Sequence, residues 1–143
     1  MTSEENSNKT EGEEQTPVKL VEITGGCHCG AVRYKAKTIE DVVLCDCNCS
    51  ICAKKRLNGF VVRKEDFILL QGADNITIYT FNTGQAKHMF CKTCGVQSFY
   101  IPRSDPEGYS IMINCVDPGT VKSATKEAFD GRNWEQAVLT KHF

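Results

Sequence analysis

Four cysteines fall within the eight residues CDCNCSIC, residues 45–52, and five more bring the total to nine in a chain of 143 residues. The odd number, together with the reducing compartment that we expect for this chain, argues against a disulfide framework. Disulfides within the short CxC pairs would also be strained. Intracellular cysteines at this density usually bind metal, so the sequence predicts a fold that is organised around metal sites.

Two of the cysteine motifs end in glycine. Cys27 and Cys29 form a CxCG motif, and Cys91 and Cys94 form a CxxCG motif, in which Gly95 permits the positive φ that such a turn often needs. Neither pair completes a tetrahedron alone. Joined, the two pairs make a closed site of four thiolates, which is the form of a structural zinc site. Such a site would tie the first hairpin to a strand about sixty residues later and would stabilise a small domain.

The third motif, CxCxxC, offers three thiolates, from Cys47, Cys49 and Cys52. Three protein ligands leave a fourth position for water or substrate, which is typical of a catalytic zinc. Two alternatives stay open here: Cys45 or Cys115 fills the fourth position and closes the site, or the metal is iron in a cluster.

A zinc ion with three thiolates carries a net charge of −1 and activates water less well than zinc held by neutral imidazoles. Thiolate-bound zinc accepts a further thiol readily and deprotonates it, which gives a sulfur nucleophile at neutral pH. The open site therefore favours a thiol substrate and an electrophilic carbon partner.

Composition excludes several other classes of protein. The formal net charge of −1 gives no overall field that would draw the chain to nucleic acid or to a membrane surface. Residues 1–16 hold five Glu and one Lys and predict a disordered acidic tail rather than a signal peptide. No apolar run is long enough to span a membrane. We expect one domain over residues 17–143 and an intracellular location, in the cytoplasm, the nucleus or both.

From Val18 onward the sequence consists of short runs rich in β-branched and aromatic residues, separated by turn residues. This pattern predicts an all-β domain, a sandwich or a small barrel. The expected strand segments are VKLVEI, AVRYKAK, VVLCDC, GFVVR, FILLQG, ITIYTF, AKHMF, VQSFYI and YSIMINCV. One helix is expected near the end, in NWEQAVLTK, with Asn133 as its cap and Gln136 completing a capping box.

The three motifs in their order, GGCHCGAVRY, CNCSICAKK and FCKTCGVQSFY, resemble the family of glutathione-dependent formaldehyde-activating enzymes and centromere protein V. The resemblance covers residues 20 to about 135, and details such as PRSDP look closer to the animal centromere protein V members. It implies a zinc-containing β-tent, packed as a small sandwich, and two zinc ions per chain. The implied ligands are Cys27, Cys29, Cys91 and Cys94 for a structural ion, and Cys47, Cys49 and Cys52 for a second, open one.

The resemblance also implies an activity. The bacterial members are carbon–sulfur lyases that join formaldehyde and glutathione as S-hydroxymethylglutathione, so a thiol such as glutathione and a small aldehyde are the expected partners, with no direct nucleic-acid binding. The alternative is a non-enzymatic, zinc-stabilised adaptor of the centromere protein V type, associated with chromosomes or the cytoskeleton. Bacterial members often have His where this chain has Asn48, and Asn cannot act as a proton shuttle.

The remaining candidates have more ordinary interpretations. The basic run Lys54-Lys55-Arg56 either attracts an anionic thiol or forms a solvated loop, which we favour. His28 is expected to point away from the metal, and His88 to be structural. Arg103 could bind a carboxylate but is expected to be an exposed turn residue. The aromatic residues are expected to pack the core around the CxxCG turn or to seal the terminal helix onto the sheet: Phe90, Phe99, Tyr100 and Trp134.

Overall fold

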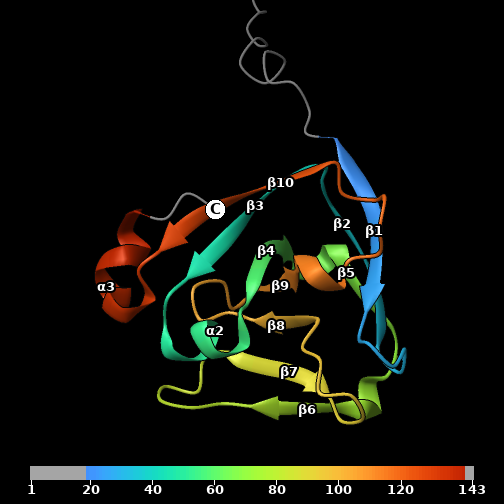
Figure 1. The fold of residues 1–143 in the computed structure, drawn as a ribbon, viewed down its shortest axis with the longest axis horizontal. Helices are drawn as coiled ribbons and strands as arrows, with labels where there is room; N and C mark the ends of the chain where they lie inside the picture. Colours follow the sequence, from blue (N-terminus) through green and yellow to red (C-terminus); the bar gives the residue numbers. More distant parts are fainter. Residues whose placement is uncertain (1–18, 141–143) are drawn as a thin grey trace, which may run out of the picture.

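The fold was derived from a computed structural model that describes residues 19–140. Its main feature is two β-sheets that share one core (Figure 1). The expected acidic tail, residues 1–16, lies outside the described residues. Within residues 19–140, no helix has the length and the apolar character needed to cross a membrane.

The smaller sheet has three strands in the order β1-β2-β5, all antiparallel: β1 (Leu20–Gly26), β2 (Arg33–Ile39) and β5 (Phe67–Gln71). The larger sheet has seven strands in the order β10-β3-β4-β9-β8-β7-β6. Their bounds are β3 (Asp41–Cys47), β4 (Asn58–Arg63), β6 (Ile76–Tyr79), β7 (Lys87–Cys91), β8 (Phe99–Ile101), β9 (Gly108–Met112) and β10 (Ser123–Phe129). The predicted all-β class is therefore confirmed, and strands are present in all nine expected segments.

Among the described residues, two short α-helices accompany the sheets. Helix α2 (Ser50–Lys55) follows β3, and the sequence interpretation did not anticipate it. The expected C-terminal helix is present as α3 (Trp134–Ala137) and continues as the 3-10 turn Val138–Thr140. Further 3-10 turns lie at Lys64–Asp66, Ala73–Asn75, Ile113–Cys115 and Gly131–Asn133. Asn133 is the residue before α3, but its side chain makes no cap bond, because its Nδ2 donates to Asp130 instead (2.9 Å).

Strand β10 is the second element that the sequence interpretation missed. It pairs in parallel with β3 along its whole length, from Ser123 opposite Asp41 to Phe129 opposite Cys47. The backbone N–H of Asn48 continues this pairing by donating to the carbonyl of Phe129 (3.2 Å). The chain that follows β10 is therefore placed beside the end of β3, where CxCxxC begins.

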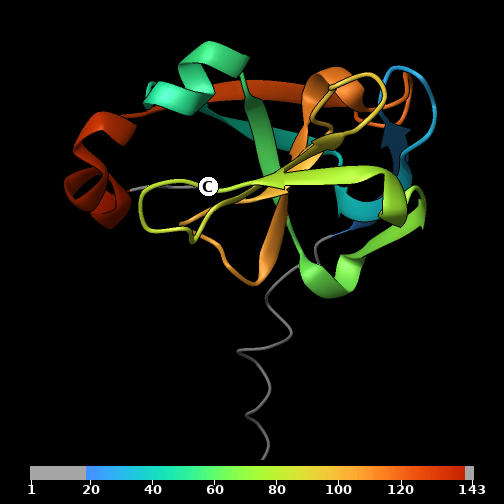
Figure 2. The same cartoon turned by 90° about the horizontal axis from the view of Figure 1, so that it is seen from below.

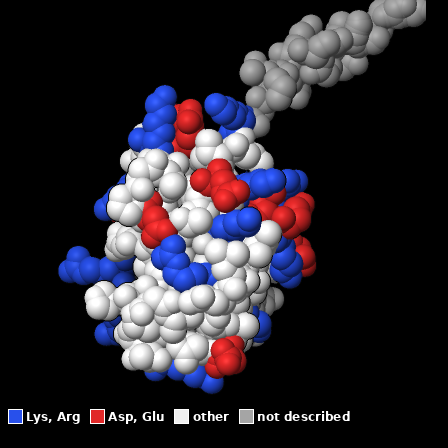
Figure 3. Space-filling model, turned by 90° about the vertical axis from the view of Figure 1, so that its right-hand side faces the viewer, with Lys and Arg blue, Asp and Glu red and all other residues white. Residues whose placement is uncertain are grey.

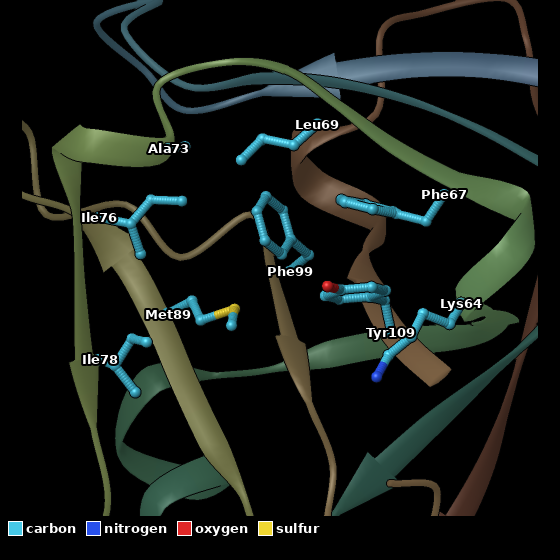
Figure 4. Close-up of a pocket in the computed structure, with 9 residues that line it drawn as sticks. All are labelled: Lys64, Phe67, Leu69, Ala73, Ile76, Ile78, Met89, Phe99 and Tyr109. Atoms are coloured by element: carbon cyan, nitrogen blue, oxygen red, sulfur yellow. The ribbon is translucent and has the colours of Figure 1, made fainter. Parts of the chain in front are cut away.

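The core between the sheets is built from alternating strand residues and from an aromatic cluster. Ile23, Tyr34 and Ile111 are fully buried. Tyr34 and Phe67 stack at 5.3 Å between ring centroids, and Phe67 stacks on Tyr109 at 4.2 Å. Phe67 and Tyr109 line a mostly apolar cavity of about 300 Å³. Figure 4 shows their rings with the other lining residues, Lys64, Leu69, Ala73, Ile76, Ile78, Met89 and Phe99. This cavity contains no cysteine.

The face shown in Figure 3 is the side of the molecule that carries the smaller sheet. Lys and Arg side chains alternate there with Asp and Glu, so the face has no patch of a single sign. Figures 1 and 2 both place α2, α3 and the loop between β6 and β7 at the opposite end of the molecule.

Candidate functional site

The first cysteine cluster joins two distant segments. Cys27 and Cys29 lie in the turn between β1 and β2, whereas Cys91 ends β7 and Cys94 follows in the next turn. All four sulfurs lie within 4.8 Å of one another. The Cys27–Cys29 and Cys29–Cys91 sulfur distances are 3.7 and 3.6 Å. A tetrahedral zinc with Zn–S bonds of about 2.3 Å requires sulfurs about 3.8 Å apart, so the cluster has the dimensions of a closed zinc site.

Backbone and side-chain donors point at these sulfurs. The N–H of Val32 donates to Cys27 Sγ (3.2 Å), and the N–H of Thr93 donates to Cys91 Sγ (3.3 Å). Asn75 Nδ2 donates to the same Cys91 sulfur (3.3 Å). Backbone donation from Cys94 and Thr93 lowers the pKa of Cys91 to about 6. Cys91 is thus prepared as a thiolate, the form in which cysteine binds metal.

The second cluster is the trio, which we define as Cys47, Cys49 and Cys52. Cys47 ends β3, Cys49 is the residue before α2, and Cys52 lies buried within α2. Their sulfurs lie within 4.8 Å of one another. The unexpected helix α2 brings this about, because one helical turn returns Cys52 to the side of Cys49.

Proton sharing within the trio favours one thiolate. Hydrogen bonds from the Cys47 and Cys52 thiols lower the pKa of Cys49 to about 2. The hydrogen bonds of Cys52, first with Cys47 and then with Cys49, raise the pKa of Cys52 above its ordinary value. The directions of these shifts place the negative charge of the trio on Cys49. A soft cation would release the remaining protons and take all three sulfurs as ligands.

The segment after β10 covers one side of the trio. A Cβ built on Gly131 would lie 2.4 Å from Cys47 Sγ and 2.8 Å from Cys49 Cβ, so only glycine permits this approach. Asn48 holds the segment in place: its Nδ2 donates to Asp130 Oδ1 (3.0 Å), and its Oδ1 accepts from the N–H of Arg132 (3.1 Å). At this position Asn48 acts as a clamp for the C-terminal segment.

The other side of the trio opens into a cavity of about 510 Å³ between α2, α3 and the loop between β6 and β7. We call it the trio cavity. Cys45 lies on its wall with the three trio cysteines, but the group of sulfurs within 4.8 Å includes neither Cys45 nor Cys115. Tyr100 and His88 also line the cavity, and their rings stack at 4.8 Å.

His88 is held in a defined tautomer by two neighbours. Lys55 Nζ donates to Gln97 Oε1 (2.6 Å), which turns Gln97 Nε2 toward His88 Nδ1 (3.2 Å). Because an ammonium group can only donate, Gln97 Oε1 must accept and Gln97 Nε2 must donate. Nδ1 of His88 is then an acceptor, and the imidazole proton resides on Nε2. Burial and the charge of Lys55 lower the pKa of His88, so the ring is neutral at pH 7.

The structure revises several expectations for single residues. His28 is exposed and lies outside both cysteine groups, as expected. His88 does more than fill the core, because it lines the trio cavity. Lys55 is not part of a solvated loop: its ammonium lies 4.6 Å from the centre of the Phe90 ring and bonds Gln97. The sequence could not reveal this, since Gln97 and Lys55 are far apart along the chain.

Two further residues sit differently from the sequence interpretation. Arg103 is not an exposed turn residue, because its guanidinium stacks over the ring of Trp134 at 3.7 Å. Trp134 thus supports Arg103 and lines the trio cavity rather than only sealing α3 onto the sheet. Phe99 packs in the core as expected, whereas Tyr100 faces the cavity.

Comparison with known proteins places these features in a family context. The sequence model of the family "Glutathione-dependent formaldehyde-activating enzyme" matches residues 22–132, which include all seven cysteines of the two clusters. A Halomonas elongata protein with the provisional name of a glutathione-dependent formaldehyde-activating enzyme is 30% identical over 80 residues. The match covers 50% of this chain and 51% of the relative, so the chain spans about half the length of that relative.

A solved structure is similar as well. The crystal structure of a Rhodobacter sphaeroides protein superposes with a TM-score of 0.63 at 30% sequence identity. The match covers 73% of this chain and 99% of the Rhodobacter chain. The greater closeness to centromere protein V that the motifs suggested is not shown by these comparisons and stays a prediction.

Proposed function

The chain belongs to the family of glutathione-dependent formaldehyde-activating enzymes, and from that premise we propose that it joins or splits a thiol and a small aldehyde, such as glutathione and formaldehyde. One observation carries the proposal: the three sulfurs of the trio form part of the wall of a cavity of about 510 Å³. The protein would then be a carbon–sulfur lyase. The odd number of cysteines, nine, suits a reducing compartment such as the cytoplasm or the nucleus.

As part of the proposal, each chain holds two zinc ions. Cys27, Cys29, Cys91 and Cys94 would surround the first ion completely, and the trio would hold the second. Zinc at the trio would supply a cation that lowers the pKa of a substrate thiol. The donor sets fit this assignment, because thiolate sulfur is a ligand that zinc prefers.

The reaction needs no oxidant or reductant. The thiol sulfur forms a bond to the carbonyl carbon, the π electrons of the carbonyl move to its oxygen, and the proton lost by the thiol ends on that oxygen. The protein must orient the aldehyde and stabilise the negative charge that develops on the oxygen during the addition.

His88 is suited to this second task. Its proton is held on Nε2 by the hydrogen bonds from Lys55 through Gln97, and it lines the trio cavity. We assign His88 Nε2–H as the donor to the aldehyde oxygen. A neutral histidine in a fixed tautomer donates without having to reorganise during the reaction. Asn48 is occupied with Asp130 and Arg132, so it takes no part in proton transfer.

The test measures exchange between free and thiol-bound formaldehyde. Carbon-13 formaldehyde and glutathione would be mixed with zinc-loaded protein, and magnetisation transfer by NMR would give the exchange rate. The wild type is expected to accelerate exchange and Cys49→Ser to abolish the acceleration. Cys115→Ser is the matched control, because Cys115 belongs to neither cluster. Acceleration that persists in Cys49→Ser would contradict the proposal. A zinc-loaded wild type without acceleration would favour the adaptor alternative.

A further inference from the structure

The end of the trio cavity formed by α3 and the turn after β8 carries an unusual cation. The guanidinium carbon of Arg103 lies 3.7 Å above the centre of the Trp134 ring, and its Nε is buried without a hydrogen-bond partner. A guanidinium that lies flat on an aromatic ring keeps its edge donors free, because the ring occupies only its face. The two terminal nitrogens form an edge with two parallel donors, whereas Nε is buried.

Leaving Nε buried and unpaired is unfavourable. An unsatisfied buried donor costs about 1–3 kcal/mol, and more in a charged group. The stacking on Trp134 holds the guanidinium in place but supplies no acceptor for this N–H. Within residues 19–140 no group accepts from this N–H, and the cavity wall beside the guanidinium holds no acidic side chain.

The trio cavity indicates which kind of acceptor suits the guanidinium. Arg103 and the trio line the same cavity, and no Asp or Glu is among the residues that line it. Arg132 adds a second cation to the wall, while Asn82, Thr83 and Ser104 add neutral polar groups. A volume of about 510 Å³ lies within the range of small-molecule sites and accommodates a ligand of peptide size.

We propose that Arg103, held flat by Trp134, binds a carboxylate of the thiol substrate and makes the cavity selective for anionic, peptide-like thiols over neutral ones. This inference rests on the proposed function, because the ligand is the thiol of that reaction. The carboxylate would accept two parallel bonds from the free edge of the guanidinium, while the sulfur of the same molecule reaches the trio.

The first experiment separates binding from chemistry. S-methylglutathione keeps both carboxylates of glutathione, but its thioether cannot become a thiolate. Calorimetry with the zinc-loaded wild type should detect binding, and Arg103→Gln should weaken it about tenfold or more. Arg103→Lys should also weaken it, because an ammonium can neither stack flat nor offer two parallel donors. Arg63→Gln is the control for loss of charge, since Arg63 does not line the cavity and pairs with Asp66.

The second experiment compares substrates. In the formaldehyde exchange assay, Arg103→Gln should raise the KM for glutathione about tenfold and leave the KM for cysteamine, which lacks a carboxylate, within about twofold. Thermal melting checks that each variant is folded. If Arg103→Gln does not fold, Arg103→Lys is used in both the binding and the substrate experiments.

The outcomes separate the two proposals. Binding of S-methylglutathione that depends on Arg103, without any turnover, would support the carboxylate site and overturn the proposed activity. Turnover with an unchanged KM for glutathione in both Arg103 variants would support the proposed activity and overturn the carboxylate site. A wild type that fails to bind S-methylglutathione, or binds it equally well in all variants, would overturn the carboxylate site.

Discussion

The two cysteine clusters offer the same type of ligand in different surroundings. In the first cluster, Cys27 and Cys29 come from one end of the chain and Cys91 and Cys94 from a strand sixty residues later, with N–H donors around the sulfurs. In the trio, all ligands come from one short stretch, and a cavity lies beside them. A cluster that joins distant segments stabilises the fold, whereas a local cluster leaves room for a substrate.

The largest expected effect tests the stabilising role directly. Cys91→Ser should cost more than about 3 kcal/mol in the free energy of unfolding, because it removes a ligand from the cluster that joins β7 to the first hairpin. Cys49→Ser should cost less than about 1 kcal/mol, because the trio joins no distant strands. Urea denaturation with metal analysis gives both numbers. Equal losses in the two variants would remove the distinction between the clusters.

The next prediction concerns the wall of the trio. Gly131→Ala places a methyl group within 2.4 Å of Cys47 Sγ, so the segment or the sulfur must move. We expect a loss of about 1–3 kcal/mol and a weaker affinity for metal at the trio, with the first cluster unaffected. Competition with a chelator would show one weakened site out of two.

Gly84→Ala is the matched control for this prediction. Its φ of 74° makes alanine unfavourable there by about 1 kcal/mol, but a Cβ at Gly84 would meet no atom within 4 Å. Gly84→Ala therefore strains only the backbone, whereas Gly131→Ala also disturbs the sulfurs of the trio. If Gly84→Ala weakened the trio as much as Gly131→Ala, the close approach of Gly131 would not be the cause.

The sequence predicted the features that depend on local pattern. Alternating apolar residues located nine strands, and the spacing of the cysteines divided seven of them into the two groups that the structure brings together. Strand β10 was missed because SATKEAF is mostly exposed and rich in Ala, Lys and Glu, which disfavour strands. The segment forms a strand because it pairs with β3, and not because its own residues favour a strand.

The features that depend on distant contacts could not be predicted. Nothing in GQAKHMF indicates that His88 meets Gln97 and, through it, Lys55. Similarly, IPRSDP reads as a turn, and only the parallel strand β10 and the start of α3 bring Trp134 beneath Arg103. The two groups of cysteines were therefore predictable from the sequence, whereas the cavity that distinguishes the trio from the first cluster was not.

The cavity also predicts a pH effect that a substitution of His88 should isolate. The folded-state pKa of His88 is lowered by burial and by Lys55, with Cys49 opposing, so the unfolded chain takes up a proton below pH 6.5 that the folded chain does not. The free energy of unfolding should therefore fall as the pH drops below 6.5. His88→Asn should lose less stability than the wild type between pH 7.5 and 5.5. If the free energy of unfolding changed equally with pH in the wild type and in His88→Asn, the His88 ring would not be held neutral.

The smallest expected effect concerns the clamp by which Asn48 holds the C-terminal segment against the trio. Asn48→Ala removes the acceptor of the Arg132 N–H and the donor to Asp130, both on the surface, so the loss should be about 1 kcal/mol or less. The sharper readout is hydrogen exchange. The amide of Arg132 should exchange faster in Asn48→Ala, while the amide of Val32, which donates to Cys27 in the first cluster, should keep its rate. Faster exchange at both amides would mean that the two clusters open together, and the division between a stabilising cluster and a local one would then fail.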